Sequence, residues 1–175
     1  VERCGLVNVI VDDMDSEGSS GICVNDTFAC VNVTIGGAIR KDSSGYANAY
    51  YRQWSRDYGM TNCVILGAAY NIGSAVNSCF VRHSVDETVM TGCRKISVAE
   101  AALDENYRPD RKTSVLVDAG VPAEGWSGTD AYGGQRVYNG AVDIGAVEAD
   151  WRERYAECLG SGSLTVVSAG PGVTE

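Results

Sequence analysis

The sequence predicts an all-β fold in which short parallel strands stack as the coils of a solenoid, followed by a short C-terminal α-helix. Two observations carry this prediction. The chain of 175 residues contains 21 glycines and only 3 prolines, set among Val, Ile, Thr, Asn and Ser, a mixture typical of short strands joined by tight turns. Similar apolar runs also recur along the chain, as a solenoid requires, because one coil cannot bury its own face.

The recurrent runs are apolar or cysteine-bearing and open with Asn, Thr or Gly. Residues 6–11 resemble residues 30–35, with their asparagines 24 positions apart, and later runs place Cys63, Cys79 and Cys93 at spacings of 16 and 14. A β-sandwich also has short strands and turns, but it does not demand like residues at recurring positions. We therefore expect ladders of stacked Asn or Cys, and parallel strands at 7–11, 31–35, 63–66 and 79–82.

The chain has seven cysteines and one histidine, His83, and contains no CxxC pair. This composition argues against zinc-ribbon and thioredoxin-like sites. We expect most of the cysteines to be buried thiols that act as small hydrophobic residues, with few disulfides among Cys30, Cys63, Cys79 and Cys93.

A two-part motif lies near the C-terminal end, Asp118-Ala119-Gly120 followed by Asp143-Ile144-Gly145-Ala146-Val147-Glu148. It resembles the closing segment of bacterial secreted right-handed parallel β-helix proteins, a pectate-lyase-like group with a choice-of-anchor type C-terminal region. The resemblance covers roughly residues 60–148. It departs from the group's pattern at Val115 and Leu116, where Pro and Ala are usual. It implies a right-handed parallel β-helix, seen as its C-terminal coils plus a terminal cap.

These patterns divide the chain into three parts. Residues 1–148 are expected to form the coils and cap, 149–160 a short amphipathic helix, and 161–175 a strand and linker towards a further module. Within the first part, the aromatic-rich residues 42–59 are expected to leave the coil pattern, and 97–113 to form a long polar connection. Since the chain begins at Val1, we expect a mature product or a piece of a longer protein.

The net charge of −9 argues against a nucleic-acid partner, which needs clustered Lys and Arg, and against docking on anionic lipid. No apolar run approaches 18 residues, so no membrane insertion is expected in this segment. The expected location is extracellular or at the cell surface.

An acidic stretch suggests calcium ligands, because Asp13, Asp15, Glu17 and Gly18 match four positions of an EF-hand loop. The twelfth position is Val24, however, so the bidentate carboxylate is missing. A solvated acidic turn is the better interpretation, and no metal ligand is predicted.

Within the aromatic-rich segment, residues 46–58 could stack on sugar rings through Tyr50 and Trp54, with Arg52 and Arg56 donating to hydroxyl or carboxylate groups. The alternative is that these aromatic residues only pack the segment down. Glycans are therefore a candidate partner.

Candidate catalytic residues have weak support. His83 and Ser84 would point to opposite faces of a strand, and nothing places Arg40 or Lys41, candidate lyase bases, beside the acidic stretch. No catalytic residue and no cofactor is predicted.

The charged residues of the terminal motif are best interpreted as structural. We expect Arg136 to be at least partly buried and bonded to Asp118, Asp143 or Glu148, tying the returning chain to the last coil. The sequence thus favours a non-enzymatic, adhesin-like surface scaffold, with a glycan or cell-surface polymer as candidate ligand. The alternative is a carbohydrate-active enzyme, a polysaccharide lyase or glycoside hydrolase. An enzyme should show a groove lined by carboxylates with Arg or Lys.

Overall fold

The structure is a computed structural model that describes residues 4–12, 20–24, 28–36, 48–52, 58–70, 72, 74–82, 85, 88–123, 128–138 and 140–149. These residues form short strands and one short helix: β1 Cys4–Val11, β2 Ser20–Val24, β3 Phe28–Ile35, β4 Asn48–Arg52, β5 Tyr58–Thr61, β6 Val64–Ile65, β7 Ala68–Tyr70, β8 Ala75–Val76, β9 Cys79–Phe80, β10 Met90–Thr91, β11 Arg94–Lys95 and α1 Val98–Ala101.

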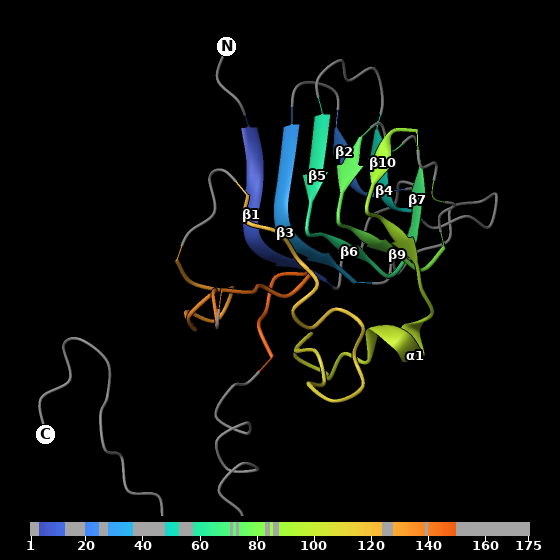
Figure 1. The fold of residues 1–175 in the computed structure, drawn as a ribbon. Coiled ribbons are helices and arrows are strands. Elements are labelled where there is room, and N and C mark those ends of the chain that lie inside the picture. Colours follow the sequence, from blue (N-terminus) through green and yellow to red (C-terminus); the bar gives the residue numbers. More distant parts are fainter. Residues whose placement is uncertain are drawn as a thin grey trace, which may run out of the picture.

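The strands pair in parallel and curl into a half-barrel, which is compatible with a parallel β-solenoid (Figure 1). The first halves of β1 and β3 stack with β5, β8 and β10, and we call this stack the first face. The second halves of β1 and β3 stack with β6, β9 and β11, forming the second face. Strands β2, β4 and β7 form a separate sheet, the third face.

The bend between the first and second faces is made by one left-handed residue in each coil. Asn8, Asn32, Asn62 and Asn77 have φ of 54°, 53°, 52° and 44°, and Gly92 follows with φ of 66°. Asparagine tolerates this conformation better than most non-glycine residues. The Asn32 Nδ2 donates to Asn8 Oδ1 at 3.0 Å, and Asn62 Nδ2 donates to Asn32 Oδ1 at 2.9 Å. These five residues form the corner ladder, which confirms the expected stacking of asparagine.

A second ladder explains part of the cysteine pattern. Two residues that directly follow a corner, Ser78 and Cys93, lend a side-chain acceptor to the neighbouring coil: the Cys63 N–H donates to Ser78 Oγ at 3.0 Å, and the Ser78 N–H donates to Cys93 Sγ at 3.4 Å. Both steps span 15 residues. Cys79 is instead in register with Val64, one position further along. The recurrent runs predicted that Cys79 occupies the same position in its coil as Cys63 and Cys93. This prediction was wrong by one residue, because Ser78 occupies that position.

The buried side chains divide between the two sides of the second face. The inner core lies inside the curl of the sheet, and its fully buried members include Cys30, Val33, Ile35, Met60, Cys63, Ile65 and Phe80. The outer core lies outside the curl, where Val64, Cys79, Ile96, Ala101, Leu116 and Ile144 are buried together. Strands β6 and β9 are buried at every residue for this reason, as parallel strands are when both faces of a sheet are covered.

The expected strands at 7–11, 31–35, 63–66 and 79–82 are confirmed as parallel by the pairings of β1, β3, β6 and β9. The expected burial of thiols is confirmed for Cys30, Cys63 and Cys79, while Cys93 is half-buried, and none of these four forms a disulfide.

The expectation that residues 42–59 leave the coil pattern was wrong in part. Within them, β4 joins the third face between β2 and β7, and Tyr58 begins β5. The Ala-Tyr-Tyr run of β4 suits a strand, because tyrosine favours the pleated surface of a sheet. In the polar connection 97–113, Ser97 and Glu100 form a capping box that begins α1. The expected helix within 149–160 and the strand within 161–175 lie outside the described residues, apart from Ala149.

We predict that Asn62→Ala destabilises the fold by roughly 2–3 kcal/mol more than Asn77→Ala. Both residues have positive φ, so the backbone cost of alanine is similar at the two positions. Asn62 makes side-chain hydrogen bonds of 2.6–2.9 Å, whereas the Asn77 Nδ2 contact with Ala119 O is 3.5 Å long. Each buried group left unsatisfied costs about 1–3 kcal/mol. Urea unfolding of both variants measures the difference, and equal losses would contradict it.

Candidate functional site

The charged residues of the terminal motif lie in a closing segment, residues 114–123, 128–138 and 140–149, that packs on the outside of the second face (Figure 1). It follows the corner ladder across the coils. Asn62 Nδ2 donates to Val121 O at 2.6 Å, Asn62 Oδ1 accepts from Val121 N at 2.9 Å, and Asn8 Nδ2 donates to Thr129 O at 2.6 Å. Besides the expected tie to the last coil, the contacts of this chain extend to the coil that contains Asn8.

Two motif glycines are required by close approaches. A Cβ on Gly120 would lie 2.7 Å from Val142 Cγ2, where the two halves of the motif meet. A Cβ on Gly145 would lie 2.9 Å from Thr34 Oγ1, and Gly145 has φ of 113°. The Gly145 N–H donates to Asn62 O at 2.8 Å. Glycine is therefore the residue that lets this segment sit directly on the second face.

The two halves of the motif are joined by the carboxylate of Asp143. Its Oδ1 accepts the Asp118 N–H at 2.7 Å, and its Oδ2 accepts the Ala149 N–H at 2.6 Å. The same carboxylate thus fixes the start and the end of the motif. Backbone bonds from Gly120 N to Val142 O and from Ile144 N to Leu116 O, both 2.9 Å, complete the junction.

Arg136 is fully buried in this junction. Its Nη2 donates to Asp143 O at 2.9 Å and to Gly145 O at 2.6 Å, and its Nε lies 3.0 Å from Glu148 Oε1. The Nε–H does not meet the carboxylate in hydrogen-bond geometry, and Nη1 has no hydrogen-bond partner among the described residues. The guanidinium therefore mainly holds backbone carbonyls of the turn, with Glu148 as its ion-pair partner.

Two further buried carboxyl groups, those of Asp130 and Glu148, accept backbone hydrogen bonds in the same junction. Asp130 Oδ1 accepts the backbone N–H groups of Tyr132 and Gly134 at 2.9 and 2.7 Å, and its Oδ2 accepts the Glu148 N–H at 3.2 Å. Both Glu148 oxygens lie 3.1 Å from the Asp143 N–H, which donates to them. We call Asp130, Arg136, Asp143 and Glu148 the buried charge cluster.

Burial is the largest cause of the raised pKa values of Glu148 and Asp143 in this cluster. It raises the pKa of Glu148 to about 8, with the Asp143 charge adding to the rise and Arg136 opposing it. Burial also raises the pKa of Asp143, against hydrogen bonds from Ala149 and Asp118 that lower it. A carboxyl group with a raised pKa near a pocket is a feature of many active sites, although ion-pair networks that only stabilise a fold shift pKa values as well.

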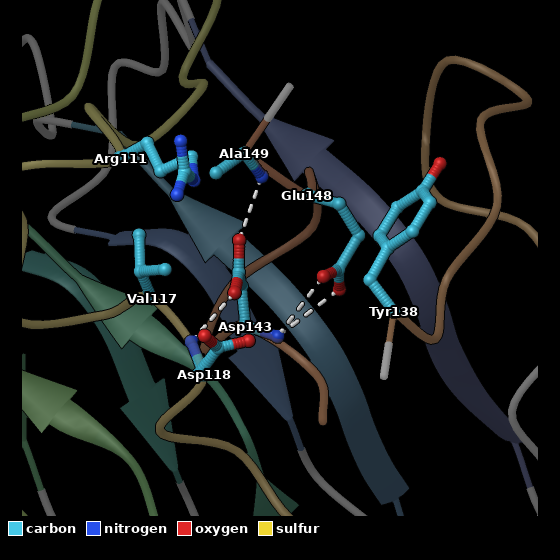
Figure 2. Close-up of a pocket in the computed structure, with 7 residues that line it drawn as sticks. All are labelled: Arg111, Val117, Asp118, Tyr138, Asp143, Glu148 and Ala149. Carbon is cyan, nitrogen blue, oxygen red and sulfur yellow. Dashed lines mark hydrogen bonds between the residues drawn. The ribbon is translucent and has the colours of Figure 1, made fainter. Parts of the chain in front are cut away.

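One small pocket borders the cluster (Figure 2). Figure 2 shows Asp143 between Asp118 and Ala149, with the Glu148 carboxyl directed towards the Asp143 backbone and the Tyr138 ring beside it. The Asp118 side chain is exposed, whereas those of Asp143 and Glu148 are buried. The lining residues are Arg111, Val117, Asp118, Tyr138, Asp143, Glu148 and Ala149.

The predicted burial and pairing of Arg136 are confirmed, with Glu148 as the ion-pair partner and the Asp143 carbonyl as an acceptor. Asp118 contributes its backbone N–H to Asp143. The acidic stretch 13–19, Arg40, Lys41 and His83 lie outside the described residues, as do Trp54 and Arg56. The described part of the chain contains no group of three His, Cys, Asp or Glu residues placed to hold a metal ion.

Sequence reasoning missed Asp130 and the corner asparagines as partners of the closing segment. Asp130 stands four residues before Gly134 in a Thr-Asp-Ala-Tyr-Gly-Gly run, and such a run is a signal for an Asx turn. The hydrogen bond from Asn62 to Val121 joins residues 59 positions apart, so no local sequence pattern predicts it.

No family model, curated protein or solved structure matches this chain. Among the described residues, no helix is long and apolar enough to cross a membrane.

We predict that Gly145→Ala destabilises the protein far more than Gly133→Ala. Both glycines have positive φ, 113° and 81°, but a Cβ on Gly133 meets nothing within 4 Å, whereas one on Gly145 meets the buried Thr34. Gly133→Ala should cost roughly 1 kcal/mol for its backbone conformation. Gly145→Ala should cost about 3 kcal/mol or more, because overpacking adds to the backbone cost. Thermal unfolding compares them, and similar losses would show that the close packing on Thr34 contributes little.

Arg136→Ala should lower the free energy of unfolding by roughly 3–5 kcal/mol, since it leaves buried carboxyl groups without their cation. Arg82→Ala is the control, because Arg82 is exposed and such a side chain contributes only about 0–1 kcal/mol. Denaturant unfolding measures both. If the two variants unfold together with the parent, the cluster does not hold the closing segment in place.

Proposed function

We propose that this protein is a right-handed parallel β-helix scaffold, exported or displayed on a cell surface and adhesin-like, in which the closing segment packs along the outside of the coils. This class is the one that the terminal motif resembles. A glycan or cell-surface polymer is the proposed ligand, and no catalysis is proposed for this chain.

Right-handedness is supported by the topology. β1 and β3 are parallel neighbours in one sheet, and β2, which follows β1 in the chain, belongs to another. A connection of this kind between parallel strands is right-handed in about 98 % of cases. The role of the closing segment in holding the coils is supported by its contacts with the corner ladder and by the outer core that it covers.

The observation that carries the scaffold proposal is the internal use of the buried charges. Both oxygens of Asp143 and both oxygens of Glu148 accept backbone N–H groups of the motif, and Arg136 Nη2 donates to two of its carbonyls. Side chains whose polar atoms are hydrogen-bonded to nearby backbone groups fix the backbone conformation of their own segment. A catalytic acid or base must instead meet the proton of a substrate within hydrogen-bond distance.

The alternative, a carbohydrate-active enzyme, has one specific observation in its favour. The pocket brings Arg111 together with Asp118, Asp143 and Glu148, and the pKa of Glu148 is raised to about 8, as in a general acid. Of these three carboxyl groups, however, only that of Asp118 is exposed. A glycosidase needs two carboxyl groups that reach the scissile bond, so the scaffold is the better supported function.

Glycan binding by the aromatic residues 46–58 should depend on Tyr50 and Trp54. The double variant Tyr50→Ala/Trp54→Ala should lose affinity for glycans that the parent retains on a glycan array. Unchanged affinity would remove this segment from the proposal and leave the scaffold itself standing.

We predict no turnover when the protein is incubated with acidic and neutral polysaccharides. The expected result is neither unsaturated products, which mark a lyase, nor new reducing ends, which mark a hydrolase. Products that disappear in Asp13→Ala or Arg40→Ala would establish the enzyme alternative at the acidic stretch. Products that disappear in Glu148→Gln would establish it at the pocket.

A further inference from the structure

The inner core is covered unequally at its two ends. In the last coil, the inner-core residue Met90 is only 2 % exposed. The first coil differs, because three apolar residues of β1 are half-buried although their register partners in β3 are fully buried. The pairs are Leu6 with Cys30, Val9 with Val33 and Val11 with Ile35. The apolar interior of the coils is therefore partly open at β1.

The backbone edge of β1 adds to this open end. Among the described strands, β1 pairs only with β3, so its other edge faces away from the sheet. The strand reads Cys-Gly-Leu-Val-Asn-Val-Ile-Val and contains no charged residue and no proline. Proteins protect a long apolar edge with charge, proline, a bulge or a covering helix or loop, because it otherwise pairs with other chains. The terminal repeat of a solenoid likewise needs a polar outer surface. A covering element is therefore expected at β1.

The closing segment brings the chain back to this end. Thr129 O accepts the Asn8 Nδ2 of the first coil at 2.6 Å, and the side chain of the next residue, Asp130, accepts the Glu148 N–H at 3.2 Å. Figure 1 shows this part of the closing segment, in orange, close to β1. Ala149 follows Glu148 and is the last residue that the structure describes. The chain beyond it therefore starts near the open end of the first coil.

The residues that come next, 150–159, have the sequence pattern of an amphipathic helix. Asp150 and Glu153 have capping-box spacing, and Gly160 is a typical helix stop. At 3.6 residues per turn, the apolar residues of this stretch fall within an arc of about 100°. They are Trp151, Tyr155, Cys158 and Leu159. Such a helix is about 15 Å long, comparable with the roughly 13 Å of a four-residue strand arm.

We propose that residues 150–159 form a helix that covers the open end of the first coil, with its apolar face packed on Leu6, Val9 and Val11 of β1. This occupant gives β1 the covering helix that its sequence lacks the charge or proline to replace. The polar side of the helix then becomes the outer surface of the solenoid end, as a terminal repeat requires.

Charge and connectivity favour this segment over a second copy of the protein. Two copies of a chain with a net charge of −9 repel each other. Arg152 and Arg154 flank the apolar face of the predicted helix, and the exposed Asp12 directly follows β1. The helix is also joined to Ala149 without a linker, and a short connection of this kind gives a high effective concentration at the site.

The test compares hydrogen exchange of the full chain, followed by mass spectrometry, in the parent and in the variant Trp151→Ala/Leu159→Ala. Alanine favours a helix at least as well as tryptophan or leucine, so the variant removes apolar surface without weakening the helix. We expect the amides of residues 4–11 to exchange roughly tenfold faster or more, because burial of side chains of this size stabilises a contact by at least that factor.

Glu157→Ala is the matched control, since it changes the opposite side of the same helix. Exchange at residues 4–11 should stay within about twofold of the parent, as for other surface substitutions. The amides of Cys79 and Val81, bonded to Cys63 O and Ile65 O within the sheet, should exchange equally in all three proteins. Unchanged exchange at residues 4–11 in the double variant would overturn the proposal. Equal acceleration throughout the sheet would overturn it as well, because the proposal places the helix on the first coil alone.

A second measurement identifies the occupant in the parent protein and covers the case in which the variants do not fold. Cys158, on the apolar side of the predicted helix, should react with N-ethylmaleimide several-fold more slowly in the native chain than in the denatured chain at the same pH. Its protection should not depend on protein concentration, because the contact is within one chain. Labelling as fast as in the denatured chain would overturn the proposal. Protection that grows with concentration would show that a second copy covers this end instead.

Discussion

The side chain of Asn62 holds the sheet and the closing segment in register. Its Nδ2 donates both to Asn32 Oδ1 and to Val121 O, its Oδ1 accepts from Val121 N, and its backbone carbonyl accepts from Gly145. Apolar packing is not directional, so the outer core alone would let the segment slide along the second face. The same residue also makes the corner of its coil, with φ of 52°. One asparagine thus sets the bend of the strand and the position of the chain that crosses it.

The buried charge cluster follows from how this crossing chain is built. Residues 140–149 form no long strand within the described structure, so much of their buried backbone must be satisfied by side chains. Asp143, Glu148 and Arg136 supply these bonds, and Asp130 adds one to the Glu148 N–H. Carboxylates are the main acceptors here, which explains why acid outnumbers base. The excess of carboxyl groups over basic groups in the cluster is a consequence of satisfying these N–H groups.

Much of the sheet could be predicted from the sequence, because repeated asparagines and apolar runs are local patterns that reflect stacking. The burial of Arg136 could be predicted as well, since a lone arginine among acidic and apolar residues needs a partner. The alignment of Cys79 failed because the ladder after the corner accepts Ser78 and cysteine alike. The path of the closing segment across all the coils was missed for a different reason. It depends on contacts between residues as far apart as Asn8 and Thr129, which leave no periodic signal.

The two cores differ in what keeps them closed. The inner core is enclosed by strands joined through parallel ladders, so it opens only when many backbone hydrogen bonds break together. The outer core is closed by irregular chain held at a few points, chiefly Asn62, Thr34 and the charge cluster. Regions with few backbone ladders open at lower free energy than the core of a fold. The closing segment is therefore the part of the described structure that we expect to open at lower free energy than the sheet.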